Sequence, residues 1–372
     1  MNNIEHNTLL SYPVFRIIDK TIVWKNKSLP IKTLIISGVI VILIICGAYL
    51  DKSIILEGDN IGLIEHPVIW ALIILQCLLP FYLKEAVSLL NNFLKSNENI
   101  ALGFDLSRYR RVFENSISRK TNISRFIYTL FVTIGFISFA WNSYQNQLPE
   151  KFLGFDFWDS INHPFGYWIT RLYKAYTWIL FFPACLHIQF SIVVTSFKVL
   201  KSVQKQKSFI LKPYHQDRYG GGGEIIKVVI KPFIPVLILA SISTLGVFFI
   251  HQKLGITPIA SLFGLSILFI ITYLLPAFQL NSLIKSEKKT KLIEISQKQD
   301  EIYSSIIDAK DSIQISQKVE LLDSLKSVSQ QIKSISNWPH LGLFIKLITL
   351  TNITTVISIA KSITPFISNV LK

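Results

Sequence analysis

Long apolar runs separated by polar segments dominate the hydropathy pattern of this 372-residue chain. A helix needs about 20 mostly apolar residues to cross the hydrocarbon core of a bilayer. Six runs approach that length, and few charges interrupt them. The pattern therefore predicts an all-α integral membrane protein with six transmembrane helices, at residues 31–50, 67–83, 126–142, 175–199, 228–250 and 256–280.

The charges of the connecting segments predict how these helices are oriented. Lysine and arginine are concentrated in loops 84–125 and 198–227, whereas loops 51–66 and 143–164 carry mainly acidic charge. Basic loops stay on the cytosolic side. We therefore expect both termini in the cytosol, with residues 1–30 as an amphipathic segment on the inner leaflet and residues 31–280 as the membrane domain.

The overall composition agrees with a lipid environment and excludes several classes of site. Half of the residues are hydrophobic, only 16% are charged, and the formal net charge is +15, which suits anionic lipid on the cytosolic side. Cys46, Cys77 and Cys185 lie inside apolar runs, so we interpret them as packing residues. No phosphate-binding loop, dinucleotide fingerprint, zinc motif or catalytic triad spacing is present, so we expect neither an enzyme nor a metal or cofactor.

The pattern changes after residue 280. Residues 281–336 contain no glycine or proline, and apolar residues recur every three or four positions, which predicts a cytosolic helical, coiled-coil extension over 281–338. This extension is either one rod or a hairpin with its bend near Ser316. Its apolar stripe predicts homo-oligomer contacts, for which the candidates are Ile302, Ile306, Ile313 and Leu322.

The last segment, 339–372, is apolar but carries a polar stripe at helical spacing. Such a stripe is typical of an amphipathic helix at an interface or between subunits. The alternative is a seventh span whose polar stripe lines a pore.

The basic loop 198–227 concentrates titratable side chains, aromatic rings and a run of four glycines. Successive backbone N–H groups in a glycine-rich turn can hold an anion, and tyrosine rings can stack on a nucleobase. The alternatives are a flexible basic linker and tyrosines at the membrane interface. His215 and Asp217 could share a metal or act as acid and base, or only tie the loop together by hydrogen bonds. The candidate ligand-binding residues are Lys207, Lys212, Tyr214, His215, Asp217, Arg218, Tyr219, Gly221 and Gly222.

Polar residues inside the apolar runs are the second group of candidates. Such residues are costly in lipid and often functional, so Gln76, His187 and Gln189 are candidates for a pathway across the membrane. The alternative is that they form hydrogen bonds between helices. Arg171 and Lys174, just before the fourth run, are expected to reach the outer headgroups.

The His215-x-Asp217 motif with its glycine run, placed between the fourth and fifth of six spans, resembles a group of bacterial multi-pass membrane proteins. The whole layout is similar to that of membrane effectors of anti-phage defence systems. The resemblance implies an oligomeric channel or membrane-disrupting effector of the bacterial inner membrane, gated by a nucleotide or oligonucleotide. The alternative function is a scaffold or sensor that recruits a protein partner through its coiled coil.

Overall fold

The computed structural model describes residues 9–21, 28–58, 60–95, 107–145, 156, 158–206, 211, 256–307 and 312–336. The regular elements of these residues are helices, which agrees with the predicted all-α class. They are α2 (Pro13–Thr21), α3 (Leu29–Leu50), α4 (Pro67–Lys95), α5 (Ser107–Ile117), α6 (Asn122–Gln145), α8 (Pro164–Ala175), η1 (Tyr176–Phe181), α9 (Phe182–Gln206), α12 (Ile256–Ile307) and α13 (Ser312–Ser334).

Four helices are long and apolar enough to cross a membrane: Leu29–Leu50, Ile69–Asn92, Arg108–Ala140 and Pro164–Gln206. They correspond to the first four predicted spans. The fifth predicted span and the C-terminal amphipathic helix lie outside the described residues. The sixth begins where α12 begins, at Ile256, and is helical.

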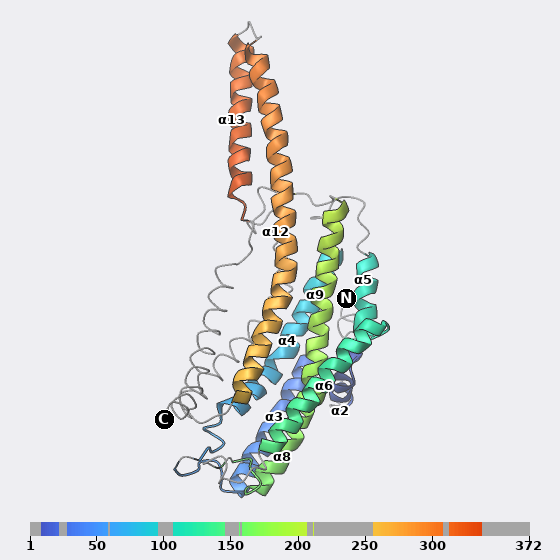
Figure 1. Ribbon diagram of the computed structural model, residues 1–372, viewed down its shortest axis with the longest axis vertical. Helices are drawn as coiled ribbons and strands as arrows, with labels where there is room; N and C mark the ends of the chain where they lie inside the picture. The colour runs from blue at the N-terminus through green and yellow to red at the C-terminus, as the bar shows by residue number, and fades with distance from the viewer. Residues whose placement is uncertain are drawn as a thin grey trace, which may run out of the picture.

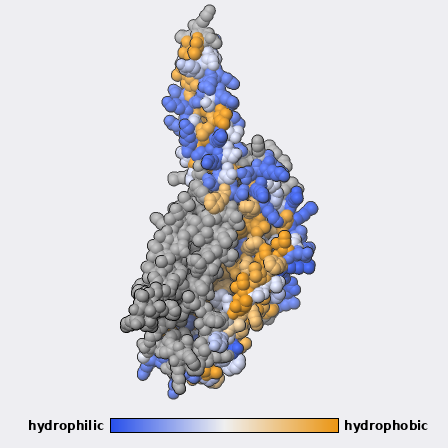
Figure 2. Space-filling view, viewed as in Figure 1, coloured by the Kyte–Doolittle hydropathy of each residue, from blue (hydrophilic) through white to orange (hydrophobic). Residues whose placement is uncertain are grey.

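The bundle is organised around α9, which contacts α4, α5, α6 and α12 (Figure 1). A second set of contacts joins α3 to α4 and to α8. The outer faces of α3 and α6 expose large apolar side chains, and Figure 2 shows an apolar band on the bundle below a mostly hydrophilic hairpin. Exposed apolar faces of this kind are what lipid contact requires.

The fourth span is longer than the sequence predicts. One uninterrupted helix runs from Pro164 to Gln206, with a π-helical segment, η1, between α8 and α9. The sequence predicts that this span begins only at residue 175. Residues 164–174, which were expected to precede it, belong to the same helix. They are helical because Pro164 stands in the first turn, where its fixed φ suits a helix and its missing N–H is not needed.

The N-terminal amphipathic segment packs on protein. The apolar face of α2 and the residues before it, including Leu9, Tyr12 and Phe15, is buried in the main core. Lys32 of α3 donates a 2.7 Å hydrogen bond to the Asp19 carboxylate of α2. Most apolar side chains of this segment therefore contact protein, and its location on the inner leaflet stays a prediction.

The extension after residue 280 is a hairpin, one of the two arrangements that the sequence left open. α12 and α13 lie side by side and project from one end of the bundle (Figure 1). The Lys288 ammonium of α12 donates to the Lys333 and Ile335 carbonyl oxygens at the end of α13, at 3.1 and 2.8 Å. α12 ends at Ile307, before the expected bend near Ser316.

Candidate functional site

The predicted ligand loop is almost entirely outside the described residues. This holds for all nine candidates: Lys207, Lys212, Tyr214, His215, Asp217, Arg218, Tyr219, Gly221 and Gly222. The structure places the residues that lead into the loop, since α9 ends at Gln206 with Lys201 and Lys205 exposed. Exposed lysines therefore stand near the end of the central helix, directly before the loop.

His187 is completely buried at the centre of a polar group that joins four segments. Its Nδ1 lies 2.5 Å from the Tyr12 hydroxyl, and its Nε2 lies 3.1 Å from the Ser124 carbonyl oxygen of α6. A carbonyl oxygen only accepts, so Nε2 carries the hydrogen and Nδ1 accepts from Tyr12. Ser116 of α5 completes the group, because its carbonyl accepts from the Ser124 hydroxyl and its own hydroxyl lies 2.9 Å from that of Ser191.

Arg119 closes this group on the side of the N-terminal segment. It occupies the turn between α5 and α6 with a φ of 57°, and its Nη2 donates a 2.9 Å hydrogen bond to the Ser11 carbonyl oxygen. Its guanidinium lies over the rings of Tyr12 and Tyr128, at 5.3 and 4.7 Å from their centroids. Such cation–π contacts hold a cation at an aromatic face, so Arg119 fixes the chain before α2 against α6 and α9.

Burial dominates the electrostatics of Tyr12. Desolvation raises the pKa of its hydroxyl well above the ordinary value, although the positive charge of Arg119 opposes the shift. The phenol is therefore neutral and able to donate to His187 over the whole physiological pH range.

Gln76 lies in a different polar group, between α4 and η1. Its side chain is fully buried, and neither amide atom has a hydrogen-bond partner of ordinary geometry among the described residues. The Tyr176 hydroxyl lies beside this amide, and Tyr173 lies near Thr177 and Cys77. The hydroxyls of Tyr173, Tyr176 and Thr177 likewise lack a partner of ordinary geometry within the described part of the chain.

The three pathway candidates are thus not brought together. Gln76 belongs to the group at η1, and His187 belongs to the group at α5 and α6. Gln189 is buried too, but it lies two residues from His187 on a helix and so points away from it. His187 forms hydrogen bonds between segments of the bundle, which is the alternative that the sequence left open for these residues.

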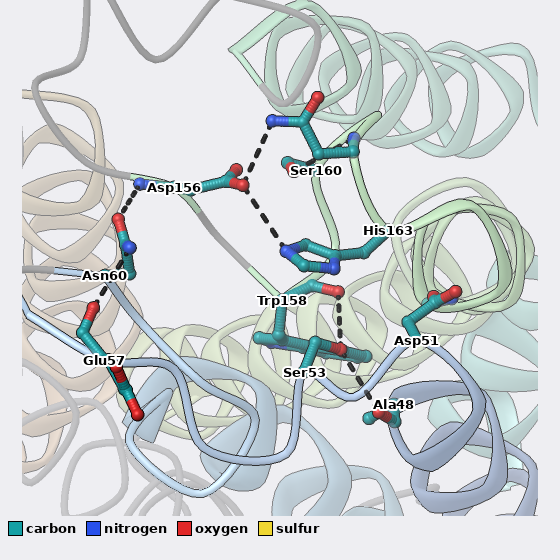
Figure 3. A network of polar contacts seen from close by, with 11 residues as sticks. Ala48, Asp51, Ser53, Glu57, Asn60, Asp156, Trp158, Ser160 and His163 are labelled. Atoms are coloured by element: carbon teal, nitrogen blue, oxygen red, sulfur yellow. Dashed lines mark hydrogen bonds and ion pairs between the residues drawn. The ribbon is translucent and has the colours of Figure 1, made fainter.

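The described residues of loops 51–66 and 156–163 form a cap beside the contacts of α3 with α4 and α8. Figure 3 shows the polar network of this cap. The Ile61 and Trp158 segments pair through two 2.9 Å backbone hydrogen bonds, and the Ser53 hydroxyl donates to the Trp158 carbonyl oxygen at 3.3 Å. The Asp51 carboxylate accepts the N–H of Gly166 at 2.6 Å. A carboxylate there satisfies a free N–H of the first turn of α8 and favours its dipole.

Lys174 also belongs to this cap, which corrects a prediction. Its ammonium donates to the Asp159 carboxylate at 2.8 Å, and both side chains are nearly inaccessible. Lys174 therefore does not reach the outer headgroups. Arg171 donates to the Tyr167 hydroxyl and stacks on the Tyr167 and Trp168 rings.

The oligomerisation candidates divide into two kinds. Ile302, Ile306 and Leu322 are half-buried at the three- and four-residue spacing of the seam between α12 and α13. Ile313, at the start of α13, is 67% exposed. The hairpin thus covers most of the stripe that was expected to need another subunit.

Several residues of these groups carry no motif that reasoning from sequence alone would find. Tyr12 and Arg119 lie outside the apolar runs, and Asp159 lies in a loop. The spacing of Thr170, Lys174 and Thr177 could have predicted that the helix begins before residue 175, because polar residues there repeat every three or four positions, as on one face of a helix.

Comparison of the chain with protein-family models, with curated proteins and with solved structures finds no match. The helices and their buried polar groups define the class of protein: an all-helical fold in which four helices are long and apolar enough to span a membrane.

Proposed function

We propose that the protein is an oligomeric channel or membrane-disrupting effector of the bacterial inner membrane, with six spans and both termini in the cytosol. The observation that supports this is the buried polar content of the long helix Pro164–Gln206. Polar groups within a span are costly and mark functional paths by default. Six of its polar side chains are at most 1% exposed: Thr170, Thr177, His187, Ser191, Thr195 and Ser196.

The hairpin is continuous with a helix that packs against this span. α12 is continuous over 52 residues, packs against α9, and extends into the hairpin. Near the base of the hairpin, the Gln204 side-chain amide of α9 donates a 2.9 Å hydrogen bond to the Ser282 hydroxyl of α12. A displacement of the hairpin would therefore also move the cytosolic end of α9.

The gating ligand in this proposal is an anion that enters from the cytosol, a nucleotide or oligonucleotide. The basic loop follows directly on α9, where Lys201 and Lys205 are exposed. A ligand held there would act on the same helix that carries the buried polar side chains.

Ion flux from liposomes tests the proposal. Purified protein should release entrapped potassium when a nucleotide or short oligonucleotide is added to the cytosolic face, and Arg218→Glu and Gly222→Val should each abolish the response. Arg218→Glu removes attraction for the anion, whereas Gly222→Val leaves charge unchanged and restricts the backbone. Absence of flux with every nucleotide, together with a stoichiometric protein partner in a pull-down, would replace the channel by a scaffold.

The scaffold is the second candidate because the free end of the hairpin exposes apolar side chains. Tyr303, Ile307 and Ile313 are 63%, 70% and 67% exposed, far from the faces of α3 and α6. Exposed apolar residues on a hydrophilic projection suit contact with another protein. On this alternative the hairpin recruits a partner and the bundle serves as its anchor.

A further inference from the structure

The buried polar side chains between α4 and η1 lack hydrogen-bond partners of ordinary geometry among the described residues, which is rare in a protein interior. Gln76 and Thr177 are 0% exposed and Tyr173 is 3% exposed. None of their side-chain polar atoms has a partner of ordinary geometry among the described residues. Buried polar atoms in folded proteins are nearly always hydrogen-bonded, to protein or to ordered water.

These side chains belong to one place. The Gln76 amide lies beside the Tyr176 hydroxyl, while Tyr173 is close to Tyr176, to Thr177 and to Cys77, the neighbour of Gln76 in α4. The site is therefore formed by α4 on one side and by the end of α8 with η1 on the other. Its polar atoms comprise one amide group and three hydroxyls.

The site lies near the middle of the candidate spans. Gln76 is nine residues into α4, and Tyr176 is twelve residues beyond the start of α8 at Pro164. At about 1.5 Å per residue these positions are about 14 and 18 Å from the capped end. Half of a hydrocarbon core is about 15 Å.

The backbone at the site is irregular as well. Tyr176 and Thr177 open the π-helical segment η1, whereas the chain before and after it is α-helical. π-Helical turns are rare and occur often at functional sites. The irregular turn thus coincides with two of the four polar residues of the site.

We propose that Gln76, Tyr173, Tyr176 and Thr177 hold a cluster of ordered water molecules at the mid-plane of the membrane domain. Each group is neutral, and together they offer both donors and acceptors, which is what water requires. A buried water makes about three hydrogen bonds to such groups.

X-ray hydroxyl-radical footprinting of the full-length protein in nanodiscs tests this directly, because radicals form from water at the site of labelling. Tyr173 should be modified about tenfold faster, or more, than Tyr12, since bound water touches only the former. The control is well matched: Tyr12 is also a buried tyrosine, but its hydroxyl is bonded to His187. Exposed Tyr303 calibrates the dose. Labelling of Tyr173 as slow as that of Tyr12 would overturn the proposal.

Two variants make a second, independent test. Thr177→Val removes a hydroxyl of the site and should reduce Tyr173 labelling several-fold. Thr33→Val removes an equally buried hydroxyl whose proton is donated to the Leu29 carbonyl oxygen, and should leave Tyr173 labelling unchanged. Equal labelling in the two variants would contradict the proposal.

The change in melting temperature on removing the Gln76 amide should have opposite signs for a hydrated site and a dry site. Gln76→Leu should lower the melting temperature if waters lose a partner, but should raise it if the amide is merely unpaired in a dry interior. A raised melting temperature would overturn the proposal. The labelling does not depend on conduction, so a labelled Tyr173 in a protein without ion flux would leave this inference standing and remove the proposed function.

Discussion

Tyr12 and His187 are 175 positions apart in the chain, and the hydroxyl of one lies 2.5 Å from the imidazole Nδ1 of the other. This bond attaches the N-terminal segment to the centre of α9. Both side chains are fully buried, so neither group can exchange its partner for bulk water.

Tyr12→Phe should destabilise the protein by about 1–3 kcal/mol, because it leaves His187 Nδ1 buried without a donor. The ring is kept, so packing against Phe15 and Tyr128 should persist. Denaturant unfolding in detergent, followed by tryptophan fluorescence, measures the loss. Tyr303→Phe, at an exposed tyrosine of the hairpin, serves as the control and should change nothing.

The stability of the protein at high pH should depend on ionisation of the same Tyr12 hydroxyl. Burial raises the pKa of Tyr12 well above its ordinary value of 10.0, so the folded state keeps the proton longer than the unfolded state. The resulting stabilisation is complete below pH 10 and is lost as the pH rises from there toward the folded-state pKa. Melting temperatures between pH 8 and 11 should fall more steeply for the wild type than for Tyr12→Phe. Parallel curves would exclude a role for this group.

Gly166→Ala should weaken the cap, whereas Gly38→Ala should not. A Cβ on Gly166 would lie 2.6 Å from the Trp158 carbonyl oxygen, while one on Gly38 would meet nothing within 4 Å. Gly38 is inside α3, where alanine is favoured by about 0.5–1 kcal/mol. The melting temperature should therefore fall for the first variant and stay or rise for the second. The same sign in both would mean that the close approach at Trp158 does not constrain residue 166.

Lys174→Met should be severely destabilising because it leaves the Asp159 carboxylate buried without its cation. Removal of one member of a buried ion pair costs about 3–5 kcal/mol. The double variant Lys174→Met with Asp159→Leu should recover most of that loss, since an apolar pair has no charge to compensate. Urea unfolding of the wild type, Lys174→Met, Asp159→Leu and the double variant forms the cycle, and additive losses would show that the pair is not coupled.

Substitutions in the hairpin should separate its folding from its association. Ile306→Asp places a charge in the seam between α12 and α13 and should unfold the hairpin, seen as lost helical circular dichroism and faster proteolysis after residue 285. Ile313→Asp changes an exposed position and should leave the hairpin folded. If copies associate through the hairpin end, Ile313→Asp alone should lower the mass by native mass spectrometry. An unchanged mass would place any assembly contact elsewhere.

Much of the architecture could be predicted because long apolar runs have few alternatives to a helix in lipid. Those runs located four of the candidate spans, and the three- and four-residue spacing after residue 280 located the paired helices. The bend was predicted too late, near Ser316, because the three- and four-residue apolar spacing continues through Ile306, Ala309 and Ile313, although α12 ends at Ile307 and α13 begins at Ser312. The start of α8 was missed because its aromatic residues suit a headgroup loop equally well.

The partners of the polar residues were beyond prediction for a different reason. Gln76 and His187 stand out as polar positions in apolar runs, but their neighbours come from segments far away in the chain. Tyr12 reaches His187 only because α2 folds back onto the bundle. Lys174 looked like an outer anchor because nothing in the sequence shows that Asp159 lies beside it.

The π-helical segment Tyr176–Phe181 divides the longest candidate span into two halves with separate rotational phase. The half before it contacts the cap, the segment itself lies beside Gln76 through Tyr176, and the half after it contains His187. A π turn absorbs one residue more than an α turn. The extra residue therefore turns the side chains after the segment by about 100°, the angle between successive residues, relative to their directions in an uninterrupted α-helix. The π-helical segment thus sets the angular offset between the side chains of α8 and those of α9.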